Sequence, residues 1–418
     1  MPPRSAGRSR PPLQRPRRRR ACVERQVVPQ PSPVRRRRRA SLTAGVQPGA
    51  SRAAMASCYR RRPMPTAVLR RSVAQLFMIG LPGPTLDRAT RAFLAEHPPG
   101  GVILFKRNIR SAAELRRLTE AIHAGGAGVR PLVALDHEGG RVDRLPRPFT
   151  HFPPAAVVGA RRDPRLAEAV GRAMGRELRA VGIDLDFAPV LDVWSNPRNR
   201  VIGDRAFGTD PARVARLGVA LARGLGRAGV LACGKHFPGH GASAGDSHFV
   251  LPRVRRSRRA LAALELVPFA RAVAAGIPAL MTAHIVYPAL DPRRPATLSP
   301  AICRDLLRRR LGFRGVLFSD DLEMNAVAAR STPARSAAAA LGAGCDMLLV
   351  CQSLDAARAA MRGVEEAVAA GTLPATDVAL ALARIAALRR RLRPEAPVRT
   401  APLGWPAHQR LASRLAAS

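Results

Sequence analysis

The sequence predicts an α/β protein, a single (β/α)8 barrel of the TIM type, and three observations support this fold. From about residue 64, short apolar runs alternate with longer segments of helical periodicity, which is typical of a parallel sheet with crossover helices. There are eight such runs over roughly 290 residues, the usual size of this barrel. No GxGxxG motif follows the early runs, so the alternative, an open doubly wound sheet with a dinucleotide site, lacks its signature.

The eight apolar runs are the expected strands, and the segments between them are the expected helices. The runs are 76–81, 101–105, 131–136, 183–189, 230–237, 278–285, 315–320 and 345–351. Four helices have a recognisable first turn, because a side-chain oxygen that can cap a helix stands directly before a proline suited to the first helical position. These pairs are Asp163-Pro164, Asp210-Pro211, Ser299-Pro300 and Thr332-Pro333.

The first 63 residues differ from the rest of the chain in composition. They contain 18 arginines and one acid, Glu24, which gives +17 of the total charge of +41 and leaves +24 for the remainder. Abundant proline and the lack of apolar periodicity predict a disordered extension. We therefore expect a disordered segment at 1–63, a barrel domain at 64–395 and a short C-terminal tail at 396–418. A basic extension could bind nucleic acid without specificity, but no recognition motif predicts a specific nucleic-acid partner.

The sequence also limits the compartment. No apolar stretch is long enough to span a bilayer, and no apolar segment typical of a secretory signal follows the arginine runs. The six cysteines form no CxxC pair and several lie within apolar runs, so we expect buried free thiols. These features predict a cytoplasmic protein.

Polar side chains follow five consecutive expected strands. In this fold the catalytic face is built from the C-terminal ends of the strands and the loops after them. Any one acid there could simply cap a helix or pair with an arginine, but charged side chains at five strand ends are a costly way to build a structural rim. The segments are Asp136 to Arg141, Asn199 to Arg205, Lys235-His236, His284, and Ser319 to Asp321.

The segment after the fifth run, Lys235 to His248, is the most informative one. It holds a lysine, three histidines and an aspartate among Gly, Ala, Ser and Pro, which cannot form a core, so its polar groups are expected to bind a ligand. Of the 70 basic residues only Lys106 and Lys235 are lysines. A compact ammonium with three donors suits a ligand hydroxyl better than a planar guanidinium does.

These residues resemble a known family, the β-N-acetylglucosaminidases of glycoside hydrolase family 3. The resemblance covers about residues 73 to 390, and the combination of KHFPGHG with DSH is its most specific part. The matching motifs are DHEGGRV (136–142), VIGDRAFG (201–208), KHFPGHG (235–241), DSH (246–248), TAHI (282–285) and FSDDLEM (318–324).

The resemblance implies a role for each matching position. Asp320 would be the nucleophile, and Asp246 and His248 would form the acid/base dyad, with His248 delivering the proton. Residues that hold sugar hydroxyls would be Asp136, Arg205, Lys235 and His236. The implied enzyme is a retaining exo-β-N-acetylglucosaminidase that needs neither metal nor cofactor. Its expected substrate is a peptidoglycan-derived muropeptide or disaccharide, and we expect a monomer.

The residue chemistry agrees with these roles but leaves alternatives open. A retaining glycosidase needs a nucleophilic carboxylate and a group that first protonates the leaving oxygen and then deprotonates water. A histidine can perform both proton transfers near neutral pH when an aspartate orients it. One alternative is a metal-dependent hydrolase, because residues of zinc-binding type are present, although no HxH pair ends the first or second strand. These residues are His236, His240, Asp246, His248 and His284. The others are a phosphorolytic variant and a β-glucosidase of the same family.

Overall fold

The computed structural model describes residues 66–125, 128–244, 251–392 and 403–417. Three expectations from the sequence lie outside these residues. They are the disorder of 1–63, the state of Cys22 and Cys58, and the placement of the dyad Asp246 and His248.

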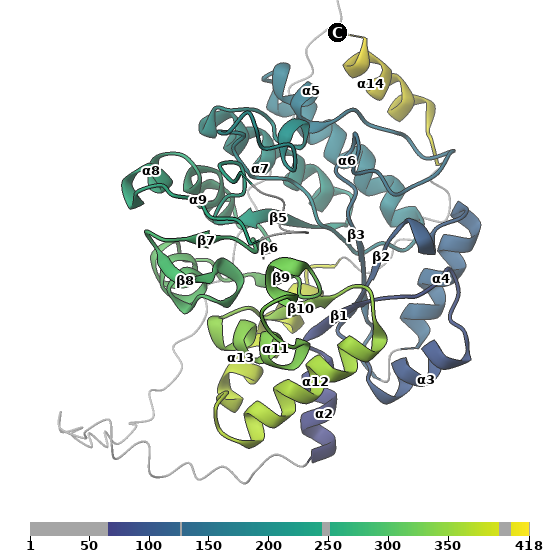
Figure 1. The fold of residues 1–418 in the computed structure, drawn as a ribbon. Helices are drawn as coiled ribbons and strands as arrows, with labels where there is room; N and C mark the ends of the chain where they lie inside the picture. The colour runs from purple at the N-terminus through teal and green to yellow at the C-terminus, as the bar shows by residue number, and fades with distance from the viewer. Residues whose placement is uncertain (1–65, 126–127, 245–250, 393–402, 418) are drawn as a thin grey trace, which may run out of the picture. The chain divides into compact units, whose positions relative to one another are not determined.

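Eight parallel strands close into a barrel in the order β1-β10-β9-β6-β5-β4-β3-β2 (Figure 1). Each strand overlaps one of the eight predicted runs, so the (β/α)8 fold class is confirmed. The strands are β1 (Phe77–Gly80), β2 (Gly101–Leu104), β3 (Leu132–Leu135), β4 (Leu185–Asp186), β5 (Leu231–Phe237), β6 (Ala279–Thr282), β9 (Val316–Asp321) and β10 (Met347–Val350). A short antiparallel pair that was not predicted, β7 (Val286–Tyr287) and β8 (Asp291–Pro295), follows β6.

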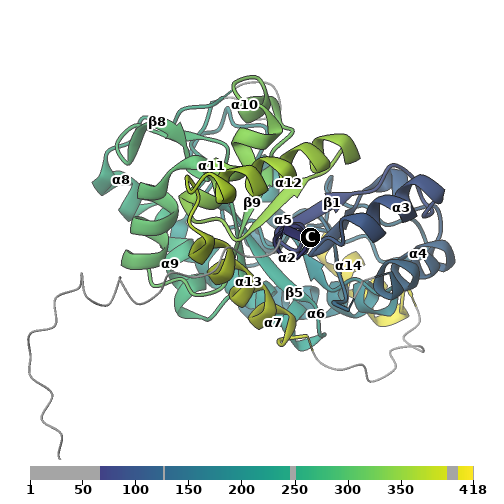
Figure 2. The same cartoon turned by 90° about the horizontal axis from the view of Figure 1, so that it is seen from below.

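Helices surround the barrel, as the view from below shows (Figure 2). The side chains of Asp163, Asp210 and Thr332 accept hydrogen bonds from the first turns of α6, α7 and α11, as predicted. The helices are α2 (Thr66–Ala74), α3 (Arg88–Glu96), α4 (Ala112–Ala124), α5 (Ala155–Ala160), α6 (Pro164–Ala180), α7 (Pro211–Arg227), α8 (Arg258–Ala263), α9 (Leu266–Ala274), α10 (Asn325–Ala328), α11 (Pro333–Ala343), α12 (Leu354–Ala369), α13 (Ala375–Arg389) and α14 (Pro406–Ala416).

The fourth predicted helix start gives a different kind of helix. Ser299 Oγ accepts a hydrogen bond from the Ile302 amide at 3.3 Å, so the cap is present. The segment η4 (Ala301–Arg310) is a π-helix rather than an α-helix. Three shorter 3₁₀ turns are η1 (Lys106–Asn108), η2 (Gly203–Arg205) and η3 (Ala296–Leu298).

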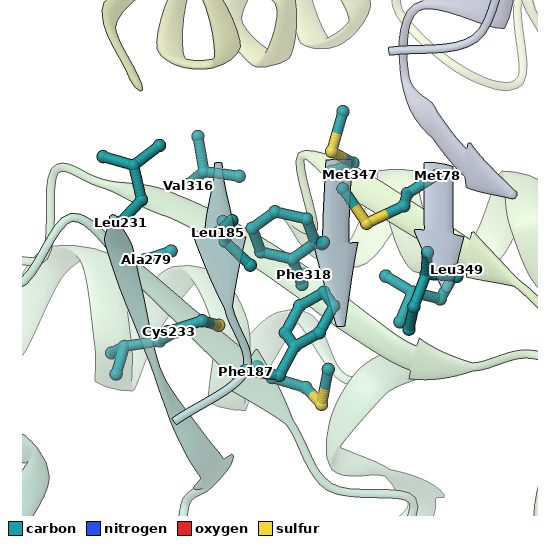
Figure 3. Packing of buried hydrophobic residues seen from close by; sticks show 14 of the residues in the cluster. Met78, Leu185, Phe187, Leu231, Cys233, Ala279, Val316, Phe318, Met347 and Leu349 are labelled. Carbon is teal, nitrogen blue, oxygen red and sulfur yellow. The ribbon is translucent and has the colours of Figure 1, made fainter. Parts of the chain in front are cut away.

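The inside of the barrel is filled with side chains (Figure 3). Phe187 and Phe318 meet edge to face, with ring centroids 5.3 Å apart, and Met78, Cys233 and Leu349 pack in the same interior. Proteins pack such interiors as densely as organic crystals, so no ligand passes through the barrel. A functional site therefore belongs at the rim.

Helix α14 lies in the segment expected to be a short tail, and it is anchored to the barrel. His408 in α14 is only 5% exposed, and its Nδ1 lies 2.7 Å from Glu177 Oε1 in α6. The same carboxylate accepts hydrogen bonds from the amide and the hydroxyl of Thr150, both at 2.7 Å. Glu177 thus links the C-terminal helix to the loop that follows β3.

The cysteines and helices of the described residues bear on two expectations from the sequence, buried thiols and the lack of a membrane span. Cys233, Cys303, Cys345 and Cys351 are buried free thiols, as predicted. Within the part of the chain that the structure describes, no helix combines the length and the apolar character needed to cross a bilayer.

Candidate active site

A cavity of about 580 Å³ lies at the C-terminal ends of the strands. Five residues predicted from the sequence line it. They are Asp136 directly after β3, Arg205 in η2, Lys235 and His236 in β5, and Asp320 in β9. Segments up to 184 residues apart in the sequence (136 to 320) are thus brought together. The other two predicted residues, Asp246 and His248, belong to the stretch 245–250, which lies outside the described residues.

Lys235 is the centre of a charged network inside this cavity. Its side chain is almost fully buried, and its Nζ lies 2.6 Å from both Asp136 Oδ1 and Glu138 Oε1. Burial acts to lower the pKa of Lys235, but the two carboxylates outweigh burial and raise it above its ordinary value. The ammonium therefore stays charged at any physiological pH, with one of its three N–H donors left for a ligand.

Glu138 balances two cations at once. Its Oε2 accepts from Arg205 Nε and its Oε1 from Arg205 Nη2, each at 2.8 Å, in a bidentate pair. Burial acts to raise the pKa of Glu138, but Arg205 and Lys235 hold it well below its usual range. Both oxygens of Glu138 are occupied, whereas Asp136 Oδ2 has only a distant contact with Arg144 at 3.8 Å. Asp136 and Lys235 therefore offer an adjacent acceptor and donor, the pair that two neighbouring sugar hydroxyls need.

His236 is held by a buried carboxylate that does not line the cavity. Its Nδ1–H donates to Asp192 Oδ2 at 2.7 Å, and Asp192 Oδ1 also accepts from the His240 amide at 2.6 Å. Burial acts to raise the pKa of Asp192, but His236 and His240 keep it low. Because its Nδ1 is engaged, His236 presents Nε2 to the cavity. Asp192 thereby fixes the imidazole that the cavity uses.

Two adjacent carboxyl groups at the end of β9 have opposite pKa shifts. Burial acts to raise the pKa of Asp320, but His284, His236 and Lys235 contribute to lowering it below its ordinary value. Burial of Asp321, aided by the charges of Glu323 and Asp320, raises its pKa to about 7. Asp320 is therefore the ionised member of the pair near neutral pH. An ionised carboxylate in this position can act as a nucleophile.

His284 supports this arrangement without lining the cavity. Its Nε2–H donates to the Asp321 carbonyl at 2.9 Å, and its Nδ1 lies 2.7 Å from Thr297 Oγ1. The imidazole therefore braces the backbone that carries both aspartates. His284 was one of the side chains singled out at the strand ends, and in the structure it supports the backbone at the end of β9 instead of lining the cavity.

The opposite shifts of Asp320 and Asp321 predict opposite effects of amide substitutions on stability. The pKa of Asp321 is raised from 3.8 to about 7 on folding, so wild-type stability falls as pH rises from about 4 to 7. Asp321→Asn should weaken that fall and make the protein more stable than wild type at pH 8, because Asn keeps the Oδ1 acceptor used by the Glu323 amide.

Asp320→Asn is the matched control. Folding lowers the pKa of the wild-type Asp320 carboxyl group, so its ionised form stabilises the protein above the unfolded pKa. This contribution is lost as pH falls through the folded pKa. Asp320→Asn should therefore lower stability at pH 7. Urea unfolding at pH 4, 6 and 8 checks both variants, and shifts of the same sign at pH 8 would contradict the assignment.

The described residues also bear on the zinc-hydrolase alternative. Within them, no group of three or more His, Cys, Asp or Glu side chains is placed to hold a metal ion. The zinc-hydrolase alternative named two ligands, Asp246 and His248, that lie outside the described residues. A cluster built from His236, His240 and His284 alone is therefore not present.

Asp192 was missed in the sequence, whereas Glu138 and Asp321 lay within the polar segments singled out at the strand ends but were given no individual role. Glu138 lies in the DHEGGRV motif, Asp321 follows the assigned Asp320, and Asp192 lies in an apolar run after β4. An acid within an apolar run needs a buried partner, and this signal could have identified Asp192.

Comparisons with known proteins identify the family of this chain. Residues 68–388 match the model of the glycosyl hydrolase family 3 N-terminal domain. A β-hexosaminidase of Chromobacterium violaceum is 48% identical over 289 residues, which are 68% of this chain and 80% of that protein. A β-hexosaminidase of Alkalilimnicola ehrlichii is 47% identical over 293 residues, or 68% and 83% of the two chains.

Solved structures show the same relationship. A family 3 β-N-acetylglucosaminidase from Paenibacillus is 37% identical with a TM-score of 0.79, over 83% of this chain and 68% of that chain. NagZ from Neisseria gonorrhoeae, in complex with N-trifluoroacetyl-D-glucosamine, is 37% identical with a TM-score of 0.68, over 82% and 98% of the two chains.

A closed (β/α)8 barrel with a charged cavity at the C-terminal ends of its strands is the architecture of an enzyme. The family model covers most of the chain, and the related proteins are nearly half identical to it, so the family can be named. The chain belongs to glycoside hydrolase family 3, among its β-hexosaminidases.

Proposed function

We propose that this protein is a retaining exo-β-N-acetylglucosaminidase that removes terminal N-acetylglucosamine from peptidoglycan fragments. The observation that carries the proposal is the cavity itself, which Asp320 lines together with Asp136, Lys235 and Arg205, the groups that would bind sugar hydroxyls. The related proteins named β-hexosaminidase and the neighbour bound to a glucosamine derivative support an N-acetylated sugar. The apolar side chains Met281 and Leu349, which also line the cavity, can contact an acetamido methyl group.

The proposed reaction has two steps. In the first, an Asp320 oxygen attacks the anomeric carbon, the bond to the leaving oxygen breaks, and His248 gives that oxygen its proton. In the second, His248 takes a proton from water, the water oxygen attacks the same carbon, and Asp320 leaves as a carboxylate. Asp246 would orient the imidazole and stabilise its protonated form. Two displacements at one carbon retain its configuration.

The substrate and compartment follow from the family and from the sequence. The Asp136–Lys235 pair would bind adjacent hydroxyls at the non-reducing end, which makes the enzyme exo-acting. We propose that the substrate is N-acetylglucosaminyl-anhydro-N-acetylmuramic acid or its peptide-bearing form, and that the enzyme acts in cell-wall recycling in the cytoplasm. Four buried free cysteines are in keeping with a reducing compartment.

Hydrolysis of paired chromogenic sugars tests the proposal. The 4-nitrophenyl N-acetyl-β-glucosaminide should be a far better substrate than the corresponding glucoside, because only the former carries the acetamido group. The converse preference would favour the β-glucosidase reading. Product analysis in phosphate buffer should show free sugar, and a sugar 1-phosphate would identify a phosphorolytic enzyme. Full activity in chelator is expected, and loss of activity with loss of a bound metal would favour the metal-dependent hydrolase.

Replacing His248 with alanine should affect substrates according to their leaving group. A good leaving group such as dinitrophenolate departs without a proton, whereas an alkyl or sugar alcohol needs one. We expect roughly a 100-fold or greater loss of kcat/KM on a disaccharide and a much smaller loss on the dinitrophenyl glycoside. Steady-state kinetics on both substrates checks this, and equal losses would argue against His248 as the acid.

A further inference from the structure

A second cavity of about 490 Å³ adjoins the catalytic one. It is formed by the start of η1 after β2 and by the loop after β3. Arg141 and Arg144 line both cavities, so the two spaces meet at these side chains. The second cavity therefore lies where a group attached to the terminal sugar would extend.

Two cationic side chains of this second cavity have little or no protein partner. Lys106 is exposed, and among the described residues its ammonium makes no hydrogen bond or ion pair. Arg144 is 27% exposed, its nearest acid is Asp136 at 3.8 Å, and its Nε has no partner within the described part of the chain. Two such charges at the boundary of a cavity favour an anionic ligand.

The one acid that lines the second cavity is already engaged. Asp143 lies 2.6 Å from His151 Nδ1 and 3.3 Å from His137 Nδ1. Burial acts to raise the pKa of Asp143, but its hydrogen bonds with these two histidines hold it at about 2. The Asp143 carboxylate is thus paired with the two histidines and forms no ion pair with Lys106 or Arg144 among the described residues.

Arg141 has a different role in the same wall. Its Nε donates to Asp204 Oδ1 at 3.0 Å, and its Nη2 donates to the carbonyls of Arg200 and Val201 at 2.8 and 2.7 Å. Arg141 therefore ties the loop after β3 to the loop before η2. It shapes the boundary between the cavities and leaves ligand binding to Lys106 and Arg144.

We propose that Lys106 and Arg144 form an anion-binding subsite that takes a carboxylate of the leaving group, so that the enzyme selects acidic aglycones. The proposal rests on the proposed function, because it places the scissile bond between the two cavities. Lys106 is one of only two lysines in the chain, and the other, Lys235, lies in the adjoining cavity. The carboxylate could belong to an acidic sugar such as muramic acid or to an attached peptide.

A ratio of specificities tests the subsite. For wild type and variants, kcat/KM is measured on N-acetylglucosaminyl-N-acetylmuramic acid, on the same disaccharide bearing a dipeptide, and on chitobiose, which is neutral. We expect wild type to prefer the acidic disaccharides and this preference to fall as salt is raised. Lys106→Gln should reduce the acidic-to-neutral ratio by about three- to tenfold and Lys106→Glu by more, because a hydrogen bond to a charged group is lost or reversed. Arg110→Gln, an exposed substitution four residues away, is the matched control and should keep the wild-type ratio.

The outcomes separate this proposal from the proposed function. A preference confined to the dipeptide substrate assigns the carboxylate to the peptide, and a preference on both assigns it to the sugar acid. Equal losses on acidic and neutral substrates, or no preference in wild type, would overturn the subsite while leaving the glycosidase intact. Calorimetric binding of free N-acetylmuramic acid does not depend on turnover. If no N-acetylglucosaminide is hydrolysed, weaker binding by Lys106→Gln than by Arg110→Gln still supports the subsite, and equal binding overturns it.

Discussion

Replacing Asp320 with alanine is expected to abolish turnover of an aryl N-acetylglucosaminide, with a loss of kcat of roughly 1,000-fold or more. The substitution removes the carboxylate that would form the glycosyl-enzyme bond, and Asp321 cannot take its place. Asp321 has a pKa raised to about 7 by burial and by the neighbouring Glu323 and Asp320, and its Oδ1 is held by two backbone amides. Steady-state kinetics with the 4-nitrophenyl substrate measures the loss.

Two controls distinguish a missing nucleophile from a damaged fold. Added azide should enter the space left by the carboxylate and restore turnover of Asp320→Ala, giving a glycosyl azide of inverted configuration, because the azide attacks only once. In wild type, a slow fluorinated N-acetylglucosaminide should label the peptide that contains Asp320, as read by mass spectrometry. Activity within tenfold of wild type, or a label on another residue, would remove Asp320 from this role.

Replacing Lys235 with methionine should cost both stability and activity. Lys235 is 2% exposed and its ammonium lies 2.6 Å from Asp136 and from Glu138, so removal of the ammonium leaves like charges facing each other in a buried site. Breaking a buried ion pair from one side costs about 3–5 kcal/mol of unfolding free energy. The lost donor to a sugar hydroxyl should lower kcat/KM by roughly 100-fold. Urea unfolding and steady-state kinetics measure the two effects.

The other lysine of the chain gives the matched control for stability. Lys106→Met removes an exposed ammonium that has no partner among the described residues, so its unfolding free energy should stay close to that of wild type. Adding Glu138→Gln to Lys235→Met should recover part of the lost stability, because the neutral amide no longer repels the charge of Asp136. Additive losses in the double variant would show that the three charges do not form one network.

The fold could be predicted because its signals are local. Each strand is an apolar run, and the capping residues Asp163, Asp210 and Thr332 lie beside the helices that they begin. The π-helical winding of η4 has no such signal, since its apolar pattern and its cap at Ser299 also suit an α-helix. The docking of α14 depends on His408 meeting Glu177, and these residues are 231 positions apart. Only the folded chain shows that pairing.

The candidate site was predictable in part for the same reason. In a parallel barrel every strand ends on one face, so Asp136, Lys235 and Asp320 could be placed together from their positions alone. The opposite pKa shifts of Asp320 and Asp321 could not, because they depend on burial and on partners distant in sequence. The cationic residues near Asp320 already favoured an ionised Asp320, but nothing in the sequence indicates that burial, with Glu323 and Asp320, raises the pKa of the identical side chain beside it to about 7.

The anchoring of α14 has a practical consequence for anyone who expresses or shortens this protein. Similarity to the family model ends at residue 388, and a recombinant chain trimmed to that border would lack His408. Glu177 would then be a buried carboxylate whose remaining hydrogen-bond partner is Thr150. The loss of His408 would therefore destabilise the loop after β3, which begins at Asp136. A stable catalytic domain therefore needs residues beyond 388, where the match to the family model ends. A purification tag placed directly after residue 388 would replace α14, which is part of the folded enzyme.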